Sequence, residues 1–508
     1  MLLKILMLVL FFTIMVCVGL YARKHATSVD GFVLGGRSVG PWLTAFAYGT
    51  SYFSAVVFVG YAGQFGWKYG LSATWIGIGN SLLGSLLAWV VLGRRTKVMT
   101  QHLNSKTMPD FFGSRYRSKP LKIAASLIVF VFLVPYTASI YNGLSRLFEM
   151  AFHIPYTTCV VGMAVFTGIY VILGGYMATA INDFIQGIIM LIGIVAVIGA
   201  VLSGQGGFLA AIQTMAQIPS DVPLTLGQPG AFTSFFGPDP VNLLGVILLT
   251  SLGTWGLPQM IGKFYSIKDE KSIHTGTVIS TVFALVIAGG CYFLGGFGRL
   301  FDAAALYNET GKLVYDGIVP HMLSSLPDIL IGVVVVLVLS ASMSTLASLV
   351  LTSSSTLTLD FLKELVARDM SERRQVRVMQ LLVVFFVLLS VLFAWNPPTF
   401  IAQLMGISWG ALAGAFLAPF LYGLYWKRVT GISVWASFAC GIGITVSNTF
   451  LHYIASPINA GAVAMLAGLV VVPVVSFLTP RPDKKKVEEI FTCYEEKVTI
   501  SKKRSLTE

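Results

Sequence analysis

The chain has 508 residues, of which 56% are hydrophobic and only 11% are charged, with a mean hydropathy of +0.80. This composition excludes an ordinary soluble globular protein and predicts an integral membrane protein. The formal net charge is +12, but the basic residues are spread over many short segments, which argues against nucleic-acid binding. Because the sequence holds no nucleotide-binding loop, catalytic triad or metal-ligand spacing, we expect no enzyme activity.

Apolar runs fill most of the chain, and a membrane helix needs about 20 such residues. They predict an all-α protein of thirteen transmembrane helices, centred in 3–22, 40–64, 71–93, 123–145, 155–174, 181–203, 240–261, 275–298, 328–357, 378–395, 399–425, 431–453 and 459–479. Residues 1–480 would form a single transmembrane domain. Residues 481–508 would form a charged cytoplasmic tail that is mostly disordered or weakly helical.

The distribution of Lys and Arg predicts the orientation, because cytoplasmic segments carry an excess of both. With the N-terminus outside and thirteen crossings, all but five of the 34 basic residues fall in inside segments. The exceptions are Lys4, Lys68, Arg146, Arg299 and Lys312. We therefore expect a multi-pass plasma (inner) membrane protein with its C-terminus in the cytoplasm and its basic loops against anionic lipid.

Two spans are interrupted by Gly, Pro and polar residues: AFAYGTSYFSAVV (45–57) and TSLGTWGLPQMIG (250–262). Lipid cannot satisfy the backbone groups that such breaks free, so they are tolerated where they line a cavity. Each break leads a group of five spans, which predicts the inverted repeats of a secondary transporter, 40–203 and 240–425. Spans 3–22, 431–453 and 459–479 would be peripheral. The alternative is that Gly and Pro are simply commoner in membrane helices.

Residues 340–360 carry hydroxyl groups but no charge until Asp360. At about 100° per residue, one helix face collects Ala341, Ser344, Thr345, Ser348, Thr352 and Ser355. Such a face offers neutral oxygen ligands to a hard cation, or it serves helix packing, which we expect of Ser348, Thr352 and Ser353. The cores of the two interrupted spans and of this one hold no titratable group for a proton relay, so Na⁺ is favoured over H⁺ as the coupling ion.

Asp183 is the one acid near the start of a span that could take part in ion movement. It would either cap a helix N-terminus or lie on the ion pathway.

Several segments, in order, resemble the sodium/solute symporters, a family with an inverted five-helix-repeat (LeuT-like) core. The matching segments are GGRSVG (35–40), MPDFFGSRYRS (108–118), GGYMATAINDFIQG (174–187), ASMSTLASLVLTSSSTLTLD (341–360), FAWNPP (393–398) and GLYWKRVT (423–430). The resemblance implies a sodium site made by the carbonyls of Thr50, Phe53 and Ala341 with the hydroxyls of Ser344 and Thr345. Asp183 would tune or relay the ion.

The resemblance also implies a solute site beside the break of the first interrupted span. Its candidates are Tyr52, Ser54, Val57, Phe58, Thr254, Trp255, Gln259, Tyr136 and Gln403. Trp255 could equally be a packing residue. Proline carriers of the family usually hold an acid where this chain has Tyr52, and Tyr looks more like the pantothenate and monocarboxylate branches. We expect a small carboxylate-bearing solute in either case.

The function expected is therefore Na⁺-coupled symport of a small organic solute by alternating access, with no obligatory protein partner. Two alternatives stay open at this point: a membrane sensor that acts through a partner protein, and an H⁺-coupled symporter. A channel suits two opposed broken helices less well than a carrier does.

Overall fold

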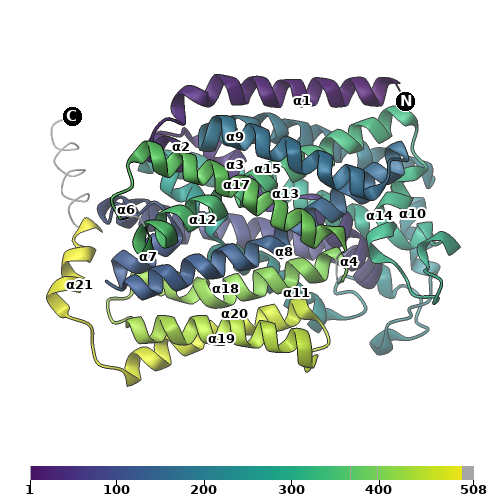
Figure 1. Cartoon of the computed structure of the whole chain (residues 1–508). Helices are drawn as coiled ribbons and strands as arrows, with labels where there is room; N and C mark the ends of the chain where they lie inside the picture. The colour runs from purple at the N-terminus through teal and green to yellow at the C-terminus, as the bar shows by residue number, and fades with distance from the viewer. Residues whose placement is uncertain (1, 367, 397–398, 495–508) are drawn as a thin grey trace, which may run out of the picture.

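The computed structural model describes residues 2–366, 368–396 and 399–494, and this part of the chain is a bundle of helices (Figure 1). The long helices are α1 (Leu2–Ala22), α8 (Lys119–Phe152), α9 (Tyr156–Gly204), α13 (Glu270–Gly295), α15 (Asp328–Thr356), α17 (Glu372–Trp395), α18 (Ile401–Tyr425), α19 (Gly431–Leu451) and α20 (Pro457–Leu478). The shorter helices are α2 (Val29–Leu34), α3 (Pro41–Tyr52), α4 (Ala62–Tyr69), α5 (Thr74–Gly79), α6 (Arg94–His102), α7 (Met108–Arg115), α10 (Phe208–Gln217), α11 (Pro240–Leu252), α12 (Pro258–Ser266), α14 (Tyr315–Ser324), α16 (Lys363–Leu365) and α21 (Lys484–Phe491).

Most residues of α15 and α18 are buried, so these two helices form the centre of the bundle. Helices α1, α19 and α20 lie at its edges and expose most of their apolar side chains, as helices that face lipid do (Figure 1).

Within the described residues, ten helices are long and apolar enough to cross a membrane, or eleven if one bent pair is a single span. The predicted count of thirteen is therefore not confirmed. The difference lies in broken or merged segments: α3 has only 12 residues, 156–169 is short, and 56–102 runs as one helical segment. Apolar runs show where lipid-compatible sequence lies, but they do not show where one helix stops and the next begins.

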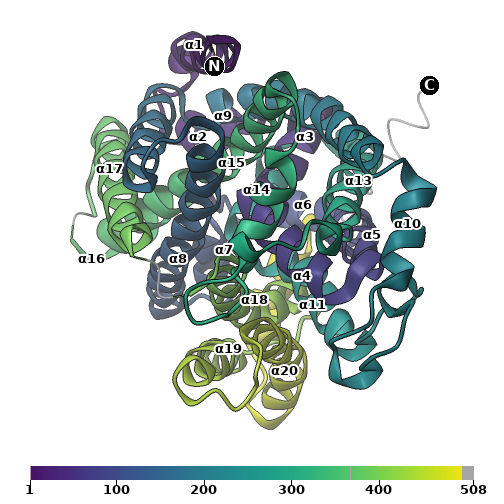
Figure 2. The same cartoon turned by 90° about the vertical axis from the view of Figure 1, so that its right-hand side faces the viewer.

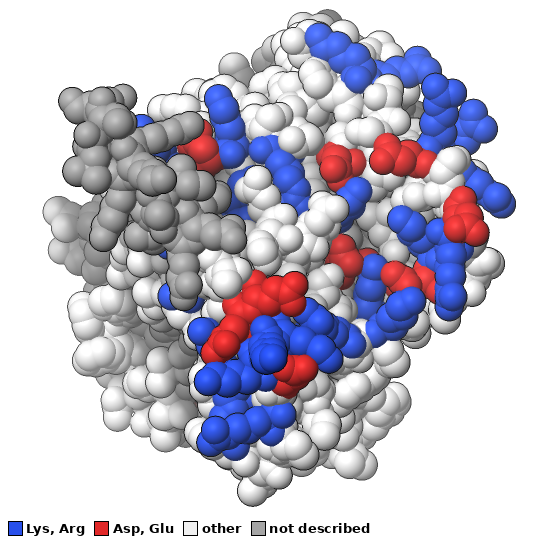
Figure 3. Space-filling view, turned by 90° about the vertical axis from the view of Figure 1, so that its left-hand side faces the viewer, with Lys and Arg blue, Asp and Glu red and all other residues white. Residues whose placement is uncertain are grey.

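The two ends of the bundle differ in charge. At the left-hand end of Figure 1, near α6 and α7, Lys and Arg side chains crowd the surface among acids, and we call this end the basic face (Figure 3). Ion pairs such as Arg94–Glu270 (2.8 Å) and Lys122–Asp110 (2.9 Å) form here. The opposite end, the loop face, is built by α10, α14 and the segment 204–239 (Figure 2).

Both predicted interruptions are present in the helices. Helix α3 ends at Tyr52, Phe53 is extended (φ −108°, ψ 124°), and the chain resumes as a π-helical turn over Val56–Tyr61. The second break runs from α11 through a 3-10 turn and an extended Leu257 into α12, with a bend of 48°. A Cβ on Gly256 would lie 2.8 Å from the Cα of Ala413, so a glycine lets this break pack directly on α18.

The tail differs in part from expectation. Residues 484–491 form α21, whose Val487, Ile490 and Phe491 are buried against the protein, and Arg117 pairs with Glu489 at 2.7 Å. Of the two forms expected for the tail, mostly disordered or weakly helical, this segment takes the helical one, because its apolar residues share one helical face. Residues 495–508 lie outside the described residues.

Candidate functional site

Five oxygen atoms from the first break and from α15 converge in the centre of the bundle. The hydroxyl of Ser344 lies 3.0 Å from the carbonyl oxygens of Thr50 and Ala341. The hydroxyl of Thr345 lies 3.3 Å from those of Thr50 and Phe53, and 3.1 Å from that of Ala341. All five residues are buried.

The break supplies two of the three carbonyls, because the turns after Tyr52 no longer provide helical N–H donors to Thr50 and Phe53, while α15 supplies that of Ala341. Two further hydroxyls of α15 form hydrogen bonds with the break: Ser342 accepts from the Ala55 N–H (3.1 Å), and Ser348 is hydrogen-bonded to Ser51 (2.9 Å). Neither contact was predicted, although Ser51 stands beside Thr50 in the interrupted segment.

The oxygen spacing suits a hard cation. Oxygen ligands about 2.4 Å from such an ion lie about 3.4 Å apart when adjacent bonds meet at right angles. The observed separations of 3.0–3.3 Å are close to this value, so small shifts would let the five oxygens surround one ion. Carbonyl and hydroxyl oxygens stay uncharged at physiological pH, which distinguishes this set from a proton-binding site.

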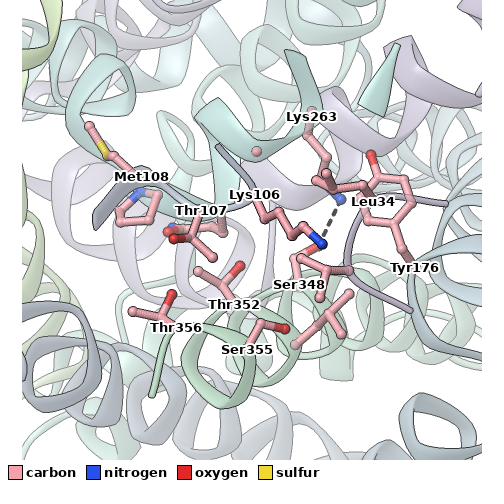
Figure 4. A pocket seen from close by; sticks show the side chains of 15 residues that line it. Leu34, Lys106, Thr107, Met108, Tyr176, Lys263, Ser348, Thr352, Ser355 and Thr356 are labelled. Atoms are coloured by element: carbon pink, nitrogen blue, oxygen red, sulfur yellow. Dashed lines mark hydrogen bonds between the residues drawn. The ribbon is translucent and has the colours of Figure 1, made fainter. Parts of the chain in front are cut away.

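A buried ion pair between α9 and α12 lies beside this oxygen cluster, and Figure 4 shows its lysine, Lys263, close to Ser348. The Lys263 ammonium is 3.6 Å from a carboxylate oxygen of Asp183 and donates to Ser348 at 3.0 Å. Both charged side chains are almost fully buried. Asp183 lies more than two turns after the kink at Gly175, so the alternative that it caps a helix N-terminus is wrong.

Lys263 was missed because the apolar run of its span ends at residue 261, and the lysine was counted among the inside loop charges. Helix α12 in fact continues to Ser266 and keeps Lys263 inside the protein. Gln259 and Lys263 are one turn apart on α12, and this i, i+4 pairing of polar residues was the available signal.

A narrow cavity of about 40 Å³ lies along the same face, between α12 and α15 (Figure 4). Its lining includes Gln259, Lys263, Ser348 and Thr352. Ser348 and Thr352 were expected to serve helix packing. Both residues also line this cavity, and Ser348 joins α15 to the first break and to Lys263 of α12, as a packing hydroxyl does.

Three aromatic rings meet next to the first break. Tyr52 stacks on Trp409 at 5.9 Å between ring centroids, and Tyr136 meets the same ring edge-on at 5.8 Å. The Tyr52 hydroxyl donates to the Thr250 carbonyl of α11, which links the two broken helices. Trp409 is the member that the sequence did not reveal, because a Trp in an apolar span carries no pattern that marks a site.

The other predicted solute residues are dispersed. Ser54, Val57 and Phe58 are buried in the turn after the first break, and Thr254 donates to the carbonyl of Ser251 (2.8 Å). The indole N–H of Trp255 donates to the Leu83 carbonyl (3.0 Å). Two residues lie apart from the aromatic group: Gln259 in the narrow cavity, and Gln403, bonded to Thr399, at the start of α18.

Comparison with known proteins gives consistent results. The profile of the sodium:solute symporter family matches residues 32–439. Sodium/proline symporters of Staphylococcus aureus strains JH9 and JH1 are each 32% identical over 437 residues, covering 84% of this chain and 81% of the relative. A solved Na⁺-coupled sialic acid symporter, 16% identical, shares the fold with a TM-score of 0.76 over 94% of this chain and 98% of that one. The chain belongs to the sodium:solute symporter family, and it is a multi-pass membrane transporter rather than an enzyme.

Proposed function

We propose that the protein carries a small carboxylate-bearing organic solute across the plasma membrane together with Na⁺, by alternating access. The observation that carries this proposal is the cluster of five neutral oxygens between the first break and α15. Because none of them titrates, the cluster suits a permanently charged ion better than a proton. In this proposal Thr50, Phe53, Ala341, Ser344 and Thr345 hold the ion.

The solute would lie beside the ion, against the aromatic group of Tyr52, Tyr136 and Trp409. The N-terminus of α12, which directly follows the second break, offers the positive end of a helix dipole to a carboxylate. The family relatives named above carry proline, whereas Tyr52 resembles the pantothenate and monocarboxylate branches. We therefore propose L-proline, pantothenate and monocarboxylates as the solutes to test.

The topology we propose has the loop face outside and the basic face in the cytoplasm. The crowding of Lys and Arg on one end supports it, since the cytoplasmic side of membrane proteins carries the basic excess (Figure 3). The repeats would span 40–203 and 240–425, with the breaks of 45–57 and 250–262 in corresponding positions.

The test is uptake by proteoliposomes of radiolabelled L-proline, pantothenate, L-lactate and acetate, each driven by an inward Na⁺ gradient. We expect one solute to accumulate with Na⁺ and not with an equal K⁺ or choline gradient. Accumulation driven by a pH gradient without Na⁺ would instead support the H⁺-coupled alternative. No accumulation of any solute, with Na⁺ binding intact, would support a sensor.

A further inference from the structure

A cavity of about 600 Å³ opens on the loop face, where residues from the ends of α4 and α11 and from the segment 204–239 line it. The helices themselves can be followed in Figure 2. Its volume falls within the roughly 300–1,000 Å³ of ordinary small-molecule sites. It is separate from the narrow cavity of Figure 4, because the two linings share no residue. The central site described above does not use it.

The cavity contains basic residues on the end of the protein where basic residues are rare. Only five basic residues are predicted on the loop face, and two of them, Lys68 and Arg299, line this cavity. Orientation selects against Lys and Arg outside, so two that gather around one cavity call for another explanation.

The cavity holds two cations and two acids, and three of these four groups have partners. Arg299 pairs with Asp221 at 2.6 Å and donates to the Trp67 carbonyl at 2.7 Å. Asp239 caps α11, where it accepts from the backbone (3.2 Å) and the side chain (2.6 Å) of Asn242. These contacts build the wall of the cavity and leave Lys68 as the remaining cation.

The Lys68 ammonium is half-buried and, within the described residues, has neither an ion-pair nor a hydrogen-bond partner. It lies over the ring of Tyr315, 5.4 Å from the ring centroid, and Asp239 attracts it from beyond ion-pair distance. A partly desolvated cation that faces an open cavity is suited to an anion from solution.

A row of aromatic rings runs from the cavity towards the first break. The rings of Tyr61, Phe65 and Tyr69 contact one another in sequence, with ring centroids 4.9 and 6.1 Å apart. Phe65 and Tyr69 line the cavity, while Tyr61 lies in the turn that follows the first break. A solute in the cavity would therefore stand at the outer end of the helix that carries the proposed sodium ligands.

We propose that this cavity is an outer capture site for the carboxylate of the transported solute, with Lys68 as its ligand and Tyr69 and Tyr315 as its apolar walls. The proposal rests on the function proposed above, because it takes its solute class from there. It adds a second, outer binding step before the solute reaches the aromatic group at the centre.

The first test measures binding without Na⁺, by saturation-transfer NMR of L-proline, pantothenate and L-lactate on the purified protein in choline buffer. We expect a signal for at least one of them that Lys68→Gln weakens about tenfold in affinity and Lys68→Arg restores. Lys312→Gln, an exposed loop-face lysine that does not line the cavity, is the matched control and should bind as the wild type does. The methyl ester of the bound solute should bind wild type and Lys68→Gln equally weakly.

The second test measures uptake, in which Lys68→Gln should raise the solute KM about tenfold and leave kcat and the Na⁺ half-saturation unchanged. The capture site is refuted if wild type shows no carboxylate signal at 10 mM solute (roughly the weak end of ordinary ligand binding), or if Lys68→Gln binds like Lys312→Gln. Because the NMR measurement contains no Na⁺ and requires no transport, it decides the capture site even if uptake proves independent of Na⁺.

Discussion

Removing the Ser344 hydroxyl is the most direct test of the proposed sodium site. In Ser344→Ala the ion loses one of five oxygen ligands, and such a contact to a charge contributes about 1.5–3 kcal/mol. The variant also loses stability in the ion-free state, because the same hydroxyl donates to the Thr50 and Ala341 carbonyls at 3.0 Å, and this bonding contributes about 1 kcal/mol. The net loss of about 0.5–2 kcal/mol corresponds to a rise of about 2- to 30-fold in the Na⁺ half-saturation.

The assay is equilibrium binding of ²²Na⁺ to the purified protein, together with uptake at saturating solute over a range of Na⁺ concentrations. Thr345→Val, which keeps the branched shape and removes the oxygen, should shift both curves in the same direction. Ser353→Ala is the matched control, since Ser353 is a buried hydroxyl of α15 outside the oxygen cluster. Unchanged Na⁺ binding in both site variants, with melting temperatures like that of the control, would refute the assignment of these ligands.

Three further predictions concern the framework around the site. Lys263→Met leaves the Asp183 carboxylate buried without its cation and should destabilise the protein by about 3–5 kcal/mol, whereas Lys263→Met with Asp183→Asn should recover most of that loss in a thermal melt. Gly256→Ala forces a methyl against α18 and should lower stability by about 1–3 kcal/mol and transport with it, while Gly262→Ala, where a Cβ meets nothing within 4 Å, should do neither. Burial raises the pKa of Asp316, which accepts the Ile401 N–H, from 3.8 to about 6, so its contribution to stability is present below about pH 4 and is lost as the pH rises through 6. Asp316→Asn should therefore remove a fall of about 3 kcal/mol between pH 4 and 7, measured as the difference between wild-type and variant melts; parallel melting curves would contradict it.

Most of the candidate site could be predicted from short stretches of sequence. The breaks depend on Gly, Pro and polar residues inside apolar runs, and the hydroxyl face of α15 follows from helical periodicity alone. Ser344 and Thr345 could therefore be placed opposite Thr50 and Phe53 with the help of the family resemblance. Once α15 packs against the first break, the distances among these four residues follow.

What the sequence did not reveal depends on where helices end and what they pack against. Lys263 was assigned to a loop because the apolar run ends at residue 261, whereas helix α12 continues to Ser266. Trp409 was overlooked because an aromatic residue in an apolar span fits lipid contact, packing and solute binding equally well. Lys68 was counted only as an orientation charge, since nothing local shows that the ends of α4 and α11 enclose a cavity with it.

The pairing of Asp183 with Lys263 also determines how the carrier responds to voltage. Whichever partner holds the shared proton, the pair sums to zero, and the five oxygens beside it are neutral. With one Na⁺ in the proposed site, the loaded centre would bear a single positive charge, which a monocarboxylate anion would cancel and a zwitterion such as proline would not. Moving one uncompensated charge is worth about 2.3 kcal/mol per 100 mV. Currents recorded during uptake would therefore report the charge of the solute, with an electrically silent cycle for an anion and an inward current for a zwitterion.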